Sequence, residues 1–219
     1  MNPMVVTNAT GAKTMPIGMT VAQPECAMTG SELTGFAVGA NVNSILLANL
    51  LSAFTAHERC GAHLYRTAAG MTQFPEWRDK YEKFLEQTED HIRILSELIG
   101  ELGGDPMYVS PQARMTEFQD MKLMEPALLA GSVDNLTMEL AVMEAVLLAE
   151  RKDQANWKLL RALADQLPDS ASAQAAIRSA VEQVDPQEDE HVRWAQESWQ
   201  RALLAQIIAG GPVGGAGRQ

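Results

Sequence analysis

Apolar residues recur at three- and four-residue steps over four long stretches of the chain, a spacing typical of helices that bury one face. These stretches are residues 43–69, 77–102, 136–167 and 171–209. The second ends at a glycine pair before Pro106 and the third ends at Pro168, and both signals stop a helix. The sequence shows no strand-like alternation of useful length, so it predicts an all-α fold.

The second and third predicted helices are separated by residues 105–134, a connection much longer than a turn between antiparallel neighbours needs. This length predicts a crossover. Apolar residues within the connection predict a short helix that lies across the bundle; they are Phe118, Met121, Leu123 and Met124. Pro186 interrupts the last stretch and leaves two interpretations, one kinked helix or two helices, the second with Asp185 as its N-cap.

The two ends of the chain lack this periodicity. Residues 1–35 are rich in Thr, Gly, Met and Pro and are predicted to form an extended N-terminal arm. Residues 36–209 are predicted to form the helical bundle, and the Gly-rich residues 210–219 a flexible tail.

The charge balance excludes two classes of partner. Lys and Arg number 17 and Asp and Glu 28, a net charge of −11, which argues against binding of nucleic acid or an anionic membrane. Cys26 and Cys60 form no CxxC pair, which favours a reducing compartment. The sequence has no apolar run long enough to span a bilayer and no recognisable secretion signal, so a cytoplasmic location is expected.

Two glutamates stand where the apolar faces of the first and third helices should continue. Glu58 and Glu150 therefore need a partner charge, a proton or a metal ion. Each is followed by Arg and, seven residues after the Glu, by an aromatic residue, Tyr65 or Trp157. Seven residues are about 700° of helical rotation, close to two turns, so each Glu shares a face with its aromatic residue.

The second and fourth helices carry a matching pair of segments. Residues 87–93 read Gln-Thr-Glu-Asp-His-Ile-Arg, and residues 187–193 read Gln-Glu-Asp-Glu-His-Val-Arg. This similarity indicates an internal duplication of a helical hairpin. Glu188 and His191 are three residues apart, so both side chains lie on one helix face and can bind one ion.

With these motifs, residues 43–206 resemble the ferritin-like superfamily of di-iron and di-manganese carboxylate bundles, including rubrerythrin and manganese catalase. The resemblance implies a four-helix bundle with a long crossover between helices 2 and 3. It implies five metal ligands, which are Glu58, His91, Glu150, Glu188 and His191. Thr88 stands where the family has a further Glu, so one bridging carboxylate is missing.

The resemblance also implies a function, that of an oxidoreductase with two Fe or Mn ions that acts on peroxide or dioxygen. Glu188 would bridge the ions. Tyr65 and Trp157 would be hydrogen-bond donors or redox-active neighbours, and Thr88 would hold a water at the centre. A homo-oligomer, a dimer or larger, is expected.

Other interpretations stay open at this point. Glu188 could instead close a capping box on a helix that starts at Asp185. Each His taken singly could be a hydrogen-bonded core residue. The whole chain could be a degenerate, metal-free bundle with a structural or interaction role, or a protein that oxidises and stores iron.

Several nearby polar residues are expected to lie outside the ligand set. Glu139 shares the face of Glu150 but is predicted to lie near the bundle end, roughly 16 Å away along the helix axis. Glu144 is predicted to be solvated. His57 and His63 are predicted at the surface or beside the ligands, and Cys60 as a small packing residue.

Overall fold

The computed structural model describes residues 24–37, 39–128, 134–168 and 172–209. These residues form helices and no strands, which confirms the predicted all-α class. In chain order the elements are η1 (Pro24–Cys26), α1 (Gly30–Gly35), α2 (Ser44–Met71), α3 (Pro75–Glu101), α4 (Pro111–Leu128), α5 (Asn135–Gln166) and α6 (Ser172–Ala209).

Local signals fix the ends of the long helices. The Asn43 side chain accepts a hydrogen bond from the Leu46 N–H at the start of α2, and Asp134 accepts one from Thr137 at the start of α5. Pro75 occupies the first turn of α3, where its missing N–H costs no helical hydrogen bond. Gly103, with a φ of 79°, follows the end of α3. The four periodic stretches thus become α2, α3, α5 and α6.

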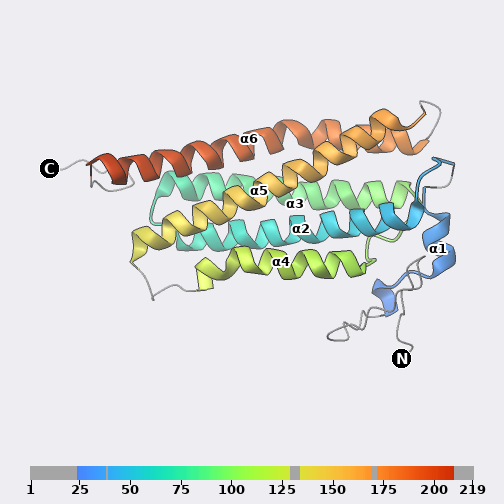
Figure 1. Cartoon of the computed structure of the whole chain (residues 1–219), viewed down its shortest axis with the longest axis horizontal. Helices are drawn as coiled ribbons and strands as arrows, with labels where there is room; N and C mark the ends of the chain where they lie inside the picture. The colour runs from blue at the N-terminus through green and yellow to red at the C-terminus, as the bar shows by residue number, and fades with distance from the viewer. Residues whose placement is uncertain (1–23, 38, 129–133, 169–171, 210–219) are drawn as a thin grey trace.

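The long helices lie side by side (Figure 1). Helix α2 packs against α3 and α5, and α6 packs against α5 and α3. The chain runs in opposite directions in α2 and α3, and again in α5 and α6. Two helical hairpins, α2–α3 and α5–α6, therefore face each other.

Helix α4 lies in the connection between the two hairpins and packs against α2 and α5. It has 18 residues and runs alongside α2 in Figure 1, so it is longer than the predicted short helix and does not cross the others. Phe118 and Met121 are each 62 % exposed, contrary to their expected packing. The face of α4 that is buried instead includes the small Ala113 and the polar Asp120.

Helix α6 continues through Pro186, so of the two interpretations the structure has one helix rather than two. Glu188 lies more than a dozen residues inside this helix. It is not an N-terminal residue, and the capping-box interpretation of Glu188 does not apply.

The apolar core is divided into two clusters. One contains Phe36, Leu51, Leu95, Leu160 and Ile177. The other contains Tyr65, Phe84, Met143, Val146 and Ala195. On each of the four long helices the two clusters occupy different ends, and a short buried polar stretch separates them. The fold thus contains a polar layer between two apolar layers.

The predicted terminal segments are described only in part. Residues 1–23 of the expected arm and the whole expected tail, residues 210–219, lie outside the described residues. The remainder of the arm contains η1 and α1, and Met28 between them is buried in the first apolar cluster. None of the described helices combines the length and apolar character that a membrane span requires.

Candidate metal centre

The polar layer brings together all five ligands predicted from the sequence. Glu58 comes from α2, His91 from α3, Glu150 from α5, and Glu188 and His191 from α6. None of these side chains belongs to a residue more than 4 % exposed. Charged groups at this depth require compensation by ion pairs, protons or a bound cation.

A first group of possible ligands contains Glu58, His91, Asp153 and Glu188. One ligand atom from each residue lies within 4.8 Å of the others. His91 Nδ1 is 3.2 Å from Glu188 Oε1 and 3.5 Å from Glu58 Oε1. The nitrogen therefore faces two carboxylates from two different helices.

A second group contains Glu150, Glu188 and His191. His191 Nδ1 is 3.1 Å from Glu150 Oε2 and 3.8 Å from Glu188 Oε1. Glu188 belongs to both groups, so its carboxylate is the one that could contact ions in both. The buried Glu, His and Asp side chains can hold a metal ion.

Several polar atoms of the layer are buried without a hydrogen-bond partner. They are Glu58 Oε2, His91 Nδ1, Asp153 Oδ1 and both carboxylate oxygens of Glu188. Buried polar atoms in folded proteins are nearly always hydrogen-bonded, and an unsatisfied group costs roughly 1–3 kcal/mol. Four of these atoms are carboxylate oxygens of the first ligand group, where a cation would satisfy them, and the fifth, His91 Nδ1, faces Glu188 Oε1 at 3.2 Å.

Two glutamines orient the histidine rings, and each glutamine contacts the histidine of the other helix. Gln187 Oε1 accepts a hydrogen bond of 3.1 Å from His91 Nε2, and Gln87 Oε1 accepts one of 3.0 Å from His191 Nε2. An amide oxygen can only accept, so each Nε2 carries the hydrogen. This leaves each Nδ1 directed at the carboxylates, as a metal ligand requires.

The electrostatics of the layer reflect its burial. Burial lowers the pKa of His91, but the charges of Glu58 and Glu188 outweigh this effect and raise it to about 10. Burial raises the pKa of Glu188 to about 8. Burial, and then the charge of Glu58, raise the pKa of Asp153 well above its ordinary value. Burial raises the pKa of Glu150, but the charge and hydrogen bond of His191, with smaller contributions from Tyr65 and His91, together outweigh burial and leave the pKa lowered.

The three residues expected beside the ligands are all buried in this region. Trp157 Nε1–H donates a hydrogen bond of 2.9 Å to Glu58 Oε1. The Tyr65 ring lies edge-on to His191, with 6.1 Å between ring centroids, and its hydroxyl is buried. Burial and then the charge of Glu150 raise the Tyr65 pKa well above its ordinary value. Thr88 faces Gly61, since a Cβ on that glycine would lie 3.8 Å from Thr88 Cγ2.

Sequence reasoning missed Asp153. This aspartate is only 5 % exposed and belongs to the first ligand group. It lies three residues after Glu150 and therefore on the same face of α5, which is the signal that could have identified it.

Of the two places expected for His57, at the surface or beside the ligands, the structure has the second, because His57 is buried next to Glu58. Its Nδ1 is 2.8 Å from Asp120 Oδ2 of α4, and its Nε2 is 3.0 Å from the carbonyl oxygen of Ala149 of α5. Burial lowers the pKa of His57, but the Asp120 carboxylate outweighs it and the net effect is a raised pKa. His57 therefore connects three helices beside Glu58 and is in neither ligand group.

The remaining polar candidates lie outside the centre. Glu144 and His63 are exposed. Glu139 is buried at the turn between α2 and α3, where it accepts a hydrogen bond of 2.7 Å from the Gln73 N–H. Cys60 is a partly buried free cysteine.

Comparison with known proteins adds no assignment. No family model, no curated protein and no solved structure matches the chain. Support for a functional site therefore comes from the geometry of the polar layer itself.

Proposed function

We propose that this chain is a ferritin-like four-helix bundle that binds two Fe or Mn ions and acts as an oxidoreductase on peroxide or dioxygen. The observation that carries the proposal is the pair of ligand groups that share Glu188, together with the unsatisfied buried atoms around it. Four helices supply these side chains, as they do in di-metal carboxylate bundles.

The donor set fits these metals. Glu58 and His91 would hold one ion, Glu150 and His191 the other, and Glu188 would bridge them. Imidazole and carboxylate donors suit iron and manganese, whereas copper(I) prefers sulfur ligands. Within the described residues neither cysteine belongs to a ligand group.

Bound Fe or Mn ions would supply one-electron redox chemistry and open coordination positions for a small oxidant. The chain's own residues hold the ligands in place. Trp157 fixes Glu58 through its indole N–H, and the two glutamines fix the histidine rings. The apolar clusters on both sides of the layer keep bulk water away.

Two further side chains have roles in this proposal. The Tyr65 hydroxyl keeps its proton at neutral pH, because burial and Glu150 raise its pKa, so it can donate a hydrogen bond to a group bound at the centre. Thr88 occupies the position of the missing carboxylate and can hold a water with its hydroxyl.

The test is the metal content of protein purified without chelator, measured by elemental analysis. We expect about two Fe or Mn ions per chain, one for each ligand group. The double variant Glu58→Ala/Glu188→Ala should lose them, whereas Glu144→Ala, which changes an exposed glutamate of α5, should retain them. No metal in the wild type, even after reconstitution with Fe or Mn, would contradict the proposal.

Activity is tested on the metal-loaded protein. The wild type should disproportionate peroxide, or consume dioxygen when ascorbate is supplied as the reductant, and Tyr65→Phe should lower the rate while the metal content stays unchanged. A chain that binds two ions and consumes neither oxidant would keep the metal site and exclude the oxidoreductase assignment.

One observation favours a second candidate, a metal-free bundle with a structural or interaction role. Thr88 replaces a carboxylate, and ion pairs within the layer already neutralise part of its charge. This candidate predicts no metal and no stabilisation by added Fe or Mn. Iron storage would instead give a very large assembly with iron far in excess of two ions per chain.

A further inference from the structure

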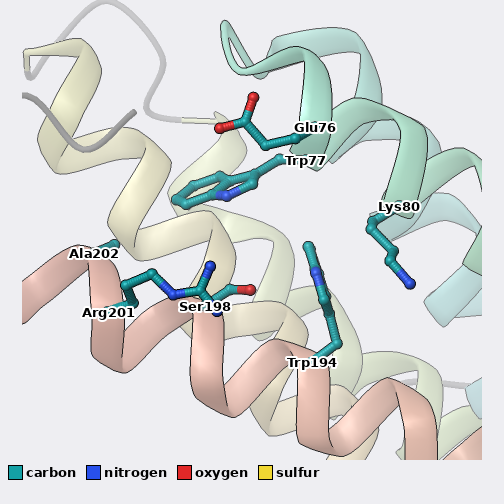
Figure 2. A pocket seen from close by; sticks show the side chains of 7 residues that line it. All are labelled: Glu76, Trp77, Lys80, Trp194, Ser198, Arg201 and Ala202. Atoms are coloured by element: carbon teal, nitrogen blue, oxygen red, sulfur yellow. The ribbon is translucent and has the colours of Figure 1, made fainter. Parts of the chain in front are cut away.

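A cavity of about 320 Å³ lies between the first turns of α3 and the C-terminal half of α6. Figure 2 shows it from close by, with Trp77 from α3 on one side and Trp194, Ser198 and Arg201 from α6 on the other. None of the lining residues belongs to the ligand groups of the candidate metal centre. The cavity is therefore a separate feature of the fold.

Two tryptophans form the aromatic walls of the cavity, and both are held in place by neighbouring rings. Trp77 packs on Phe74 with 5.0 Å between ring centroids. Trp194 packs edge-on against Tyr81 at 5.4 Å and Phe84 at 5.3 Å. Rigid indole walls are suited to a flat aromatic ligand, because they offer large contact areas and lose little conformational freedom on binding.

The charged side chains that line the cavity differ in their ion pairing and in the direction in which they point. Lys80 pairs with Glu190 at 2.9 Å, and in Figure 2 its ammonium group points away from the tryptophans. Arg201 is exposed, has no ion pair among the described residues, and in Figure 2 extends its guanidinium group toward the space below Trp77. Glu76 also lines the cavity, and in Figure 2 its carboxylate lies on the other side of Trp77 from Arg201.

An unpaired arginine beside aromatic walls indicates the chemistry of the ligand. The planar guanidinium fork matches a carboxylate in a two-point hydrogen-bonded pair. The buried Ser198 lines the same cavity and offers a further hydroxyl. The volume is at the lower end of the roughly 300–1,000 Å³ typical of ligand pockets, which fits one or two fused rings.

We propose that this cavity binds a small aromatic carboxylate, with its ring between Trp77 and Trp194 and its carboxylate at Arg201. The binding site would lie one aromatic layer from the candidate centre, since Phe84 contacts Trp194 on one side and His191, at 4.1 Å between ring centroids, on the other. The proposal does not depend on whether the centre holds metal.

The test is a calorimetric titration of the full chain with 2-naphthoate. We expect saturable binding at one site in the wild type. Arg201→Gln and Trp194→Leu should each weaken the affinity by about tenfold or more, because each removes one of the two recognition elements. Glu76→Gln should tighten binding, since it removes a negative charge that repels the ligand's carboxylate.

Matched variants and ligands distinguish binding in this cavity from binding elsewhere on the chain. Trp199→Leu and Arg178→Gln change the same residue types on the same helix outside the cavity and should leave the affinity unchanged. Cyclohexanecarboxylate lacks the aromatic ring and 2-naphthalenemethanol lacks the charge, so both should bind more weakly. The variant Glu58→Ala/Glu188→Ala should bind 2-naphthoate normally, which excludes binding at the candidate metal centre.

Two results would overturn the proposal. One is the absence of saturation up to about 10 mM 2-naphthoate, which is weaker than most specific ligand sites. The other is equal affinity of the wild type and Arg201→Gln. Arg201 and Glu76 are both exposed, so their variants decide the question even if Trp194→Leu does not fold.

Discussion

At the residue scale, three candidate ligands, Glu58, His91 and His191, are each held by a residue of another helix. Trp157 of α5 holds Glu58 of α2, and Gln187 of α6 holds His91 of α3. Such outer hydrogen bonds fix the orientation and basicity of a metal ligand. The geometry of the centre therefore depends on residues that would not themselves contact metal.

Trp157→Phe tests this dependence. The variant keeps an aromatic ring but loses the N–H that donates to Glu58 Oε1, so metal affinity should fall by about tenfold or more. Affinity for Mn(II) is measured by calorimetric titration. Trp199→Phe, a substitution away from the ligand groups, should bind Mn(II) like the wild type. Equal affinities of Trp157→Phe and the wild type would show that the indole does not orient the ligand.

Glu139 gives a prediction for pH dependence. Burial raises the pKa of this carboxyl above its ordinary value of 4.5. The folded protein then holds the proton more tightly than the unfolded chain, so stability falls as pH rises from 4.5 through the pKa of the folded state.

Glu139→Gln removes this titration and keeps an oxygen acceptor for the Gln73 N–H. At pH values above the folded-state pKa of Glu139, the variant should be more stable than the wild type. Its stability should also change less with pH. Urea unfolding between about pH 4 and pH 7 measures the difference. Glu144→Gln, at an exposed position, should follow the wild type. A constant difference between Glu139→Gln and the wild type at every pH would contradict the prediction.

At the element scale, polar contacts attach α4 and the residues before it to the rest of the structure. Ser52 of α2 donates a hydrogen bond of 2.7 Å to the Tyr108 carbonyl and accepts one of 2.9 Å from the Ser110 N–H. Further along, His57 pairs with Asp120. The outward face of α4 carries exposed apolar residues instead.

Asp120→Ala should destabilise the protein because it leaves His57 Nδ1 buried without an acceptor. Removal of one partner of a buried ion pair costs about 3 kcal/mol or more, measured as the free energy of unfolding in urea. Lys122→Ala removes an exposed ion pair from the same helix and should cost less than about 1 kcal/mol. If both variants lose the same small amount, the His57–Asp120 pair does not anchor α4.

Alanine substitutions at two glycines near the end of α3 should change the stability of the protein in opposite directions. A Cβ at Gly104 would lie 2.6 Å from Phe36, whose ring is fully buried, so Gly104→Ala should cost about 1–3 kcal/mol. Gly100 lies within α3 with open space around it, and Gly100→Ala should stabilise the helix by about 0.5–1 kcal/mol. Thermal and urea unfolding of both variants check the signs.

The four long helices could be predicted from the sequence because their apolar periodicity is long and two of them end at clear stop signals, the glycine pair after α3 and Pro168 after α5. The orientation of α4 could not, since its inward face is small and polar and its largest apolar residues face outward. The burial of His57 could not be predicted for a related reason. This residue lies about 100° from Glu58 around α2, a direction that would face solvent if α4 did not cover it.

Asp153 illustrates the same limit of prediction from the sequence, here within the candidate metal centre. Its position on the face of Glu150 follows from the sequence, but its closeness to Glu58 and His91 is a contact between different helices. The five ligand positions were expected from the resemblance to the ferritin-like superfamily, which does not include Asp153. Which of them share one ion position required the packing of all four helices.

At the scale of the whole molecule, the candidate ligands connect α2, α3, α5 and α6. A ligand that binds only the folded state raises the free energy of unfolding by about 2.7 kcal/mol at a hundredfold excess over its Kd. For a chain of this size, we expect Mn(II) at that excess to raise the Tm by roughly 5–10 °C. Differential scanning calorimetry measures the shift, and Glu58→Ala/Glu188→Ala should show none. An equal shift in both proteins would indicate binding elsewhere.

The crosswise glutamine–histidine pairs have a consequence for the origin of the chain. Gln87 of the first hairpin contacts His191 of the second, and Gln187 of the second contacts His91 of the first. This reciprocity is the contact pattern of a two-fold symmetric dimer, in which two identical hairpins would complete each other. In such a dimer both halves must carry the same residues. In a single chain that constraint does not apply, so Thr88 can face Gly61 in one half while Glu188 and Asp153 occupy the matching positions in the other.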